Sequence, residues 1–245
     1  MNTASRQVIH APTQWLKPAI HPAYGRLLCG HVRNKGVDIE SLFKGNSLTW
    51  LELQQQQGFI SYSQFQHLLD SAINATQCPW LGLEIGSMVQ VSVHGPLGYG
   101  ALSAPTVKKA FIIVGKALAT RITCYRFQLS YNNDQAIITL IEEFDPHSLR
   151  EFIDVILLGS FLDLLEKTLG YICQGIEVSL PFTPPSWHEL YYEKYNKIKV
   201  SFDSDMFKIV FPCHILSEPC LTADDFSYRN ALRECDQLLA SQLFN

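Results

Sequence analysis

The sequence predicts an α+β fold in which antiparallel hairpins pack on a long core helix, beside a helical N-terminal lobe. Three observations carry this prediction. Apolar residues repeat at helical spacing up to about residue 120. From residue 123 the pattern changes to the alternation of a strand, and a second, more apolar strand follows. The segment 147–173 is then apolar on most of its surface, which indicates a helix in the core.

The N-terminal end is polar and contains Pro12 and Pro18, which discourage regular structure. Residues 1–20 are therefore expected to form a flexible arm. No strong linker divides the remainder of the chain, so residues 21–245 are expected to form one domain.

The helices of the N-terminal lobe are predicted from apolar spacing and from residues that begin or end helices. One helix starts at Pro22 and stops before Gly36. Another follows a serine cap at Ser61 or Ser63. A short helix is predicted over 80–88.

Glycines concentrate between residues 81 and 106, a stretch predicted as a helix, a loop and the start of another helix. Gly98 and Gly100 are expected to pass tightly against another element. A phosphate-binding loop is the alternative interpretation. The stretch lacks the Gly-Lys-Ser/Thr ending of a nucleotide loop and the Gly-x-Gly-x-x-Gly spacing, so a structural turn is favoured.

The next elements are a helix and a hairpin. The helix is predicted over 105–120, with Ser103 or Ala104 as its cap and a proline in its first turn. Residues 123–131 and 136–141 flank an Asn-Asn-Asp turn and are predicted to pair as antiparallel strands.

The C-terminal third repeats this mixture of strands and helices. Its predicted elements are a core helix over 147–173, a strand over 176–180, a hairpin of 199–202 with 206–211, and a final helix over 223–244.

Composition narrows the classes of function. The chain is 47% hydrophobic and only 17% charged, which fits a large core or a surface covered by a partner. A net charge of −4 disfavours binding of nucleic acid by this chain alone. The polar start and the lack of a long apolar run predict neither a signal peptide nor a membrane span. Seven scattered cysteines are typical of reduced cytoplasmic thiols.

The patterns of catalytic and metal sites are missing from the sequence. The eight histidines form no His-x-x-x-His pair, and there is no Gly-x-Ser-x-Gly elbow. Cys213 and His214 are adjacent and Cys220 follows, so a metal or haem site there is the alternative to a buried thiol beside a surface imidazole. The sequence predicts a protein that is not an enzyme and that uses no cofactor or metal.

Two motifs carry a resemblance to a known family. They are Leu-Gly-Leu-x-x-Gly at 81–86 and Gly-x-Leu-Gly-Tyr-x-x-x-Ser-x-Pro-Thr at 95–106. The hairpin, the long apolar helix, a tyrosine-rich stretch before Val200-Ser201-Phe202, and Leu216-Ser217-Glu218-Pro219 follow in order. This arrangement resembles the effector-sensing, arabinose-binding-type domain of AraC/XylS bacterial transcription regulators over about 22–245.

The resemblance implies a cytoplasmic effector-binding and dimerisation domain that binds a small molecule and forms a homodimer. Family members continue into a DNA-binding domain with helix-turn-helix units, and this chain is expected to lack that domain and to reach DNA only through it. The predicted final helix would transmit the signal by a population shift. The alternative is a stand-alone protein–protein interaction module with no small-molecule ligand.

Aromatic residues gather around the predicted sheet and core helix. Ligand pockets are mostly apolar with a few polar groups, and Tyr and Trp supply both, although the same residues also fill ordinary cores. An arginine, Arg121 or Arg126, would pair with an acidic ligand. The candidate ligand-binding residues are His94, Tyr99, Arg121, Tyr125, Phe127, Phe161, Trp187 and Tyr191.

Overall fold

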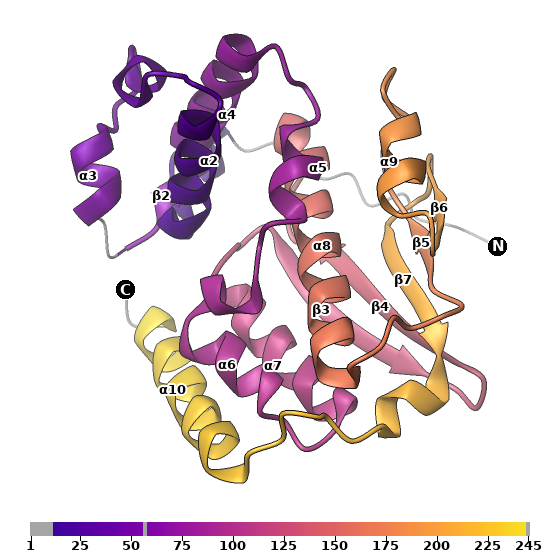
Figure 1. The fold of residues 1–245 in the computed structure, drawn as a ribbon. Coiled ribbons are helices and arrows are strands. Elements are labelled where there is room, and N and C mark those ends of the chain that lie inside the picture. The colour runs from indigo at the N-terminus through magenta and orange to yellow at the C-terminus, as the bar shows by residue number, and fades with distance from the viewer. Residues whose placement is uncertain (1–11, 56–57, 244–245) are drawn as a thin grey trace, which may run out of the picture.

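A five-stranded sheet with the strand order β3-β4-β7-β5-β6 forms one side of the molecule (Figure 1). The computed structural model describes residues 12–55 and 58–243. The strands are β3 (Tyr125–Tyr131), β4 (Gln135–Glu142), β7 (Phe207–Pro212), β5 (Glu177–Ser179) and β6 (Lys199–Ser201). Neighbouring strands are antiparallel, except that β5 and β6 are parallel. With helices packed against this sheet, the predicted α+β class is confirmed.

The first predicted hairpin is confirmed and the second is wrong. β3 and β4 pair across the predicted turn. β6 and β7, expected to pair with each other, are separated by β5, which pairs with both. The burial pattern explains the order: Val178 of β5 is buried, whereas β6 exposes Lys199 and Ser201 and therefore suits the edge of the sheet.

Helices α7 (Val107–Ala119) and α8 (Arg150–Leu169) lie against the sheet (Figure 1). The ring centroid of Phe111, on α7, lies 6.5 Å from the ring centroid of Phe127 on β3 and 5.7 Å from that of Phe211 on β7. Phe161 of α8 is 5.9 Å from Phe127. These aromatic contacts place the core between the two helices and the sheet.

The core helix is shorter than expected. Residues 147–149 form a separate 3₁₀ turn, η3 (His147–Leu149), before α8 begins. At the other end Gly170 adopts a left-handed conformation, with φ of +76°, and ends the helix at Leu169.

The helical lobe contains α1 (Pro12–Trp15), α2 (Pro22–Asn34), η1 (Ile39–Phe43), α3 (Trp50–Gln55), α4 (Tyr62–Thr76) and α5 (Leu81–Gly86). Ser61 is the cap of α4: its hydroxyl accepts a bond from the Gln64 amide, and the Gln64 side chain accepts one from the Ser61 amide. Of the expected arm, residues 1–11 lie outside the described part of the chain. Strand β1 (Pro18–Ile20) pairs with β2 (Ile60–Ser61).

The glycine-rich segment corrects two predictions. The expected loop is largely a helix, α6 (Pro96–Leu102), which follows η2 (Val91–His94). Gly95 takes a φ of +61° and sets up Pro96 as the first helical residue. The cap of α7 is Thr106, whose hydroxyl accepts a bond from Lys109, in place of Ser103 or Ala104.

The chain then passes through α9 (Glu189–Lys194) and η4 (Cys213–Ser217) to its last helix, α10 (Asp225–Leu243). Figure 1 shows α10 against α6, far from the edge strand β6. The last two residues of the predicted final segment lie outside the described residues. No helix in the described part of the chain is long and apolar enough to cross a membrane.

Candidate ligand pocket

An apolar cavity lies between α2, α6, α7 and α8. Its volume is about 50 Å³, within about 510 Å³ of unfilled space that includes the open mouth. The apolar side chains of its wall are Leu97, Ala101, Val114, Ala117, Leu118, Leu157, Phe161 and Leu164. Tyr24, His94, Arg121 and Ser160 are its polar members. An apolar wall with a few polar groups is the usual lining of a small-molecule site.

Among the described residues that line the cavity, Arg121 is the one with a cationic side chain, and it is nearly buried, with 9% of its surface exposed. Its Nη2 donates a hydrogen bond of 2.7 Å to the carbonyl of His94. Its Nε has no hydrogen-bond partner, and no Asp or Glu of the described residues forms an ion pair with it. Burial lowers the pKa of Arg121, but an arginine remains charged. The cavity therefore contains an uncompensated positive charge.

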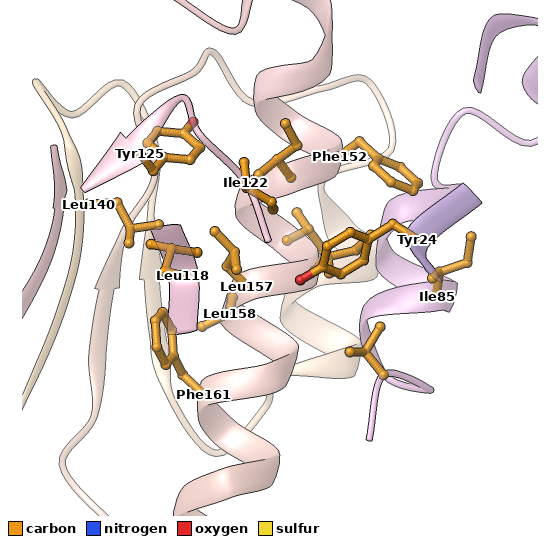
Figure 2. Close-up of a cluster of buried hydrophobic side chains, with 14 of the residues drawn as sticks. Tyr24, Ile85, Leu118, Ile122, Tyr125, Leu140, Phe152, Leu157, Leu158 and Phe161 are labelled. Carbon is orange, nitrogen blue, oxygen red and sulfur yellow. The ribbon is translucent and has the colours of Figure 1, made fainter. Parts of the chain in front are cut away.

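Two further polar groups lie next to this guanidinium. Burial raises the pKa of Tyr24, so its hydroxyl stays protonated, and that hydroxyl has no hydrogen-bond partner among the described residues. Burial and the charge of Arg121 lower the pKa of His94 to about 4, so the imidazole is neutral near pH 7. Figure 2 shows Tyr24 reaching from α2 toward Leu157 of α8.

The backbone fixes the position of Arg121. It directly follows Thr120, which ends α7, and its amide donates to the carbonyl of Leu118 at 2.9 Å. Its own carbonyl accepts a bond of 2.8 Å from the amide of His21, the cap of α2. A β-carbon at Gly95 would lie 3.5 Å from Nη2 of Arg121. The end of α7, the start of α2 and the turn before α6 thus hold the guanidinium.

Helix α6 connects the cavity to α10. Leu97, Gly98 and Ala101 line the cavity. Gly100 lies directly against Ala231 of α10, so that an added β-carbon would clash with the alanine side chain. Any movement of α6 therefore has to move or strain α10.

Three of the residues predicted to bind a ligand, His94, Arg121 and Phe161, line this cavity. Phe127 does not line it but packs on Phe161. Tyr99 points elsewhere and is 59% exposed, although it belongs to α6.

The other predicted residues lie apart from the cavity. Trp187 and Tyr191 stack on each other at 5.3 Å near α9. Tyr125 is buried beside Asp154 of α8. The alternative arginine, Arg126, is exposed and its Nε donates to Glu143 at 2.8 Å.

Tyr24 and Ser160 are lining residues that the sequence did not indicate. Tyr24 sits on the buried face of α2 with Leu28 and Val32, a position typical of core packing. Ser160 donates to the carbonyl of Ile156 and has no sequence signal of its own. Within the described ranges, no group of three or more His, Cys, Asp or Glu side chains could hold a metal ion, and this includes the segment around Cys213 and His214.

A family model supports the family suggested by the motifs. The N-terminal arabinose-binding domain of the AraC transcription regulator matches residues 36–220. The matched range includes the cavity wall from α6, α7 and α8, and it leaves out α2 and α10.

Two similar proteins are both from Pseudomonas aeruginosa. The ornithine utilization regulator is 24% identical over 230 residues, which are 94% of this chain and 68% of that protein. The crystal structure of the transcriptional regulator CdpR has a TM-score of 0.64 at 15% identity and covers 86% of this chain. The match spans 61% of the CdpR chain, so the likeness concerns the fold of a part of that protein.

Proposed function

The chain belongs to the family of N-terminal arabinose-binding domains of AraC transcription regulators, and from this premise we propose that its cavity binds a small-molecule effector. The domain would sense the effector and pass the signal to a DNA-binding domain. Both similar proteins are named as regulators, which supports a regulatory role in place of an enzymatic one.

One observation carries the proposal: α6 forms a wall of the cavity and also packs directly against α10. Besides the contact of Gly100 with Ala231, the carbonyl of Leu102 accepts a bond of 2.6 Å from the Thr222 hydroxyl. The carbonyl of Ser103 accepts one of 2.9 Å from the Asp224 amide. The C-terminal end of α6 is therefore tied to the residues that begin α10.

The mechanism follows from this connection. A ligand that fits one position of α6 better than another shifts the population toward that position. Because α6 and α10 are packed and hydrogen-bonded together, α10 follows. The size of the signal is limited by the difference in the ligand's affinity for the two positions. DNA recognition and homodimer formation belong to this proposal as properties of the complete regulator.

The name of the similar P. aeruginosa protein links that regulator to ornithine utilization. Ornithine is not proposed as the effector of this chain. None of the described residues that line the cavity is an Asp or Glu that could pair with the amino groups of a diamino acid.

A ligand screen followed by hydrogen exchange tests the proposal. A panel of small metabolites and fatty acids is screened by thermal shift, and native mass spectrometry detects a ligand carried through purification and the oligomeric state. With a stabilising compound, amide exchange should slow around the cavity and also change in residues 225–243. Protection confined to the cavity would contradict signalling through α10, and the absence of any stabiliser or bound mass would favour an interaction module.

A further inference from the structure

We propose that the effector is a small carboxylate with an apolar body, whose carboxylate pairs with Arg121 while the body contacts the apolar wall. This inference rests on the proposed function, since it names the chemistry of the ligand that the cavity would take. The argument has three parts: an unsatisfied cation, a second donor beside it, and the absence of any group that would bind a cationic ligand.

The unsatisfied cation is the first part. Burying a charge is costly unless the charge is paired and hydrogen-bonded. Arginine has five N–H donors in a planar fork, yet the described residues give Arg121 a single side-chain hydrogen bond, to the carbonyl of His94. The Nε donor remains free, and a carboxylate is the group whose geometry matches the arginine fork.

The surrounding charges add to the attraction for an anion. Burial, and then the positive charges of Arg121 and Arg26, lower the pKa of His21 to about 3. No carboxylate of the described residues opposes them in the cavity lining. The electrostatic potential around the guanidinium is therefore positive, and a positive potential favours an anionic ligand over a neutral one.

Tyr24 is the second donor. Its buried hydroxyl has no partner in the described residues, and Tyr24 and Arg121 line the same cavity. A carboxylate has two oxygens and can accept from several donors at once. One ligand group would therefore satisfy two buried donors that the described protein leaves free.

The remaining wall limits the rest of the ligand. Leucine, alanine, valine and phenylalanine side chains surround the cavity, and Ser160 already donates its hydroxyl proton to Ile156. An ammonium group would be buried without an acidic partner, which disfavours zwitterionic amino acids. The enclosed volume of about 50 Å³ is smaller than the roughly 150 Å³ of a cavity that holds benzene. The body of a short aliphatic or single-ring acid would therefore extend from the guanidinium into the open mouth, within the about 510 Å³ of unfilled space.

Matched acids and amides test this chemistry directly. Hexanoate and benzoate are compared with hexanamide and benzamide, which have nearly the same shape but no charge, by calorimetric titration of the whole chain. The acids should bind about ten- to a hundredfold more tightly than the amides, as expected for a charge-assisted pair.

Variants assign the preference to the two donors. Arg121→Met should remove the preference for the acids, and Tyr24→Phe should weaken acid binding by about threefold to tenfold. The control is Arg126→Met, because Arg126 is an exposed arginine paired with Glu143 and should leave binding unchanged. The Tyr24 variant and the acid–amide comparison remain informative if the methionine variant does not fold.

Three outcomes overturn the inference, and they differ in what else they reject. Equal binding of acids and amides by the wild-type chain would reject the carboxylate and leave the proposed function standing. Failure of the acids to bind, while another compound of the metabolite panel binds in the cavity, would also reject the carboxylate alone. A failure of every compound would reject the proposed function together with this inference.

Discussion

Two regions of the molecule treat a charged side chain in opposite ways: the partly exposed Glu84 has several partners, whereas the buried Arg121 has few. Glu84 of α5 accepts bonds from His31 at 2.5 Å, from Lys35 at 2.8 Å and from the Trp80 indole at 3.1 Å. Burial alone would raise the pKa of Glu84, but the bonds from Lys35 and His31 outweigh it and lower the pKa to about 2. Arg121, at the end of α7, has one carbonyl acceptor and no counter-ion among the described residues.

A third ionisable side chain, Asp154, shows why the different surroundings of Glu84 and Arg121 are informative. Asp154 of α8 is fully buried, and burial raises its pKa to about 8, so it keeps its proton at neutral pH. A carboxyl group can escape the cost of burial in this way, but an arginine cannot. Glu84 is satisfied by the fold and Asp154 by a proton. Arg121 has neither a counter-ion among the described residues nor a proton that it can lose, and this difference is the basis for proposing that it binds a ligand.

The largest expected effect concerns Asp154→Asn and its dependence on pH. The pKa of Asp154 in the folded chain, about 8, lies above its ordinary value of 3.8. Between these values the folded state holds a proton that the unfolded state has lost, so stability falls as pH rises, by about 1.4 kcal/mol per pH unit from this group.

Asparagine removes this titration and retains the shape of the side chain. The free energy of unfolding of Asp154→Asn, minus that of the wild type, should therefore rise from pH 4.5 to pH 7.5 in urea titrations. Glu142, Arg150, Glu151 and Tyr125 act on the same carboxyl group, and they are unchanged in both proteins. A difference that does not vary with pH would show that Asp154 is already ionised in the folded chain.

A smaller but still substantial effect is expected at the satisfied charge. Glu84→Ala leaves His31, Lys35 and the Trp80 indole without their common acceptor, so the free energy of unfolding should fall by about 2 kcal/mol. The control is Glu143→Ala, which breaks an exposed pair with Arg126 and should cost about 0.5 kcal/mol or less. Equal losses in the two variants would remove the contrast between the Glu84 cluster and an ordinary surface pair.

The next effect tests the contact between α6 and α10. Gly100→Ala should destabilise the chain by about 1.5 kcal/mol and increase hydrogen exchange in α10, because the new methyl group meets Ala231. Gly30→Ala is the matched control, since no atom lies within 4 Å of a β-carbon at that position. It should be neutral or slightly stabilising. If the amides of α10 exchanged at the same rate in both variants, the packing of α6 would not stabilise α10.

The sequence predicted those features that depend on local chemistry. A serine before a run of helical spacing predicts the cap of α4, with Ser61 and Ser63 both as candidates, and the Asn-Asn-Asp turn joins two alternating segments. Both features follow from neighbouring residues. The pairing partners of β6 and β7 could not be predicted in this way. An alternating pattern shows that a segment is a strand, but it does not show which strand lies next to it. Glycines in α6 suggested a loop by propensity, but packing against α10 makes them favourable within a helix.

The candidate site shows the same limit. The sequence indicates Arg121 by its charge near an aromatic region. That Arg121 has no counter-ion among the described residues depends on how distant segments pack, which the sequence does not show. Tyr24 and Tyr62 both sit on apolar helix faces. The hydroxyl of Tyr62 accepts a bond from the Cys124 amide at 3.0 Å, whereas that of Tyr24 has no partner in the described residues. Only the structure shows which of the two hydroxyls lacks a hydrogen-bond partner among the described residues.

Thermal unfolding of Arg121→Met, with and without hexanoate, tests the central claim most directly. Replacing an unpaired buried cation by an apolar side chain of similar length should raise the melting temperature of the ligand-free chain. The increase that hexanoate causes in the wild type should disappear in the variant. A variant that melts lower without ligand and is still stabilised by hexanoate would contradict the assignment of Arg121 as the residue that binds the ligand.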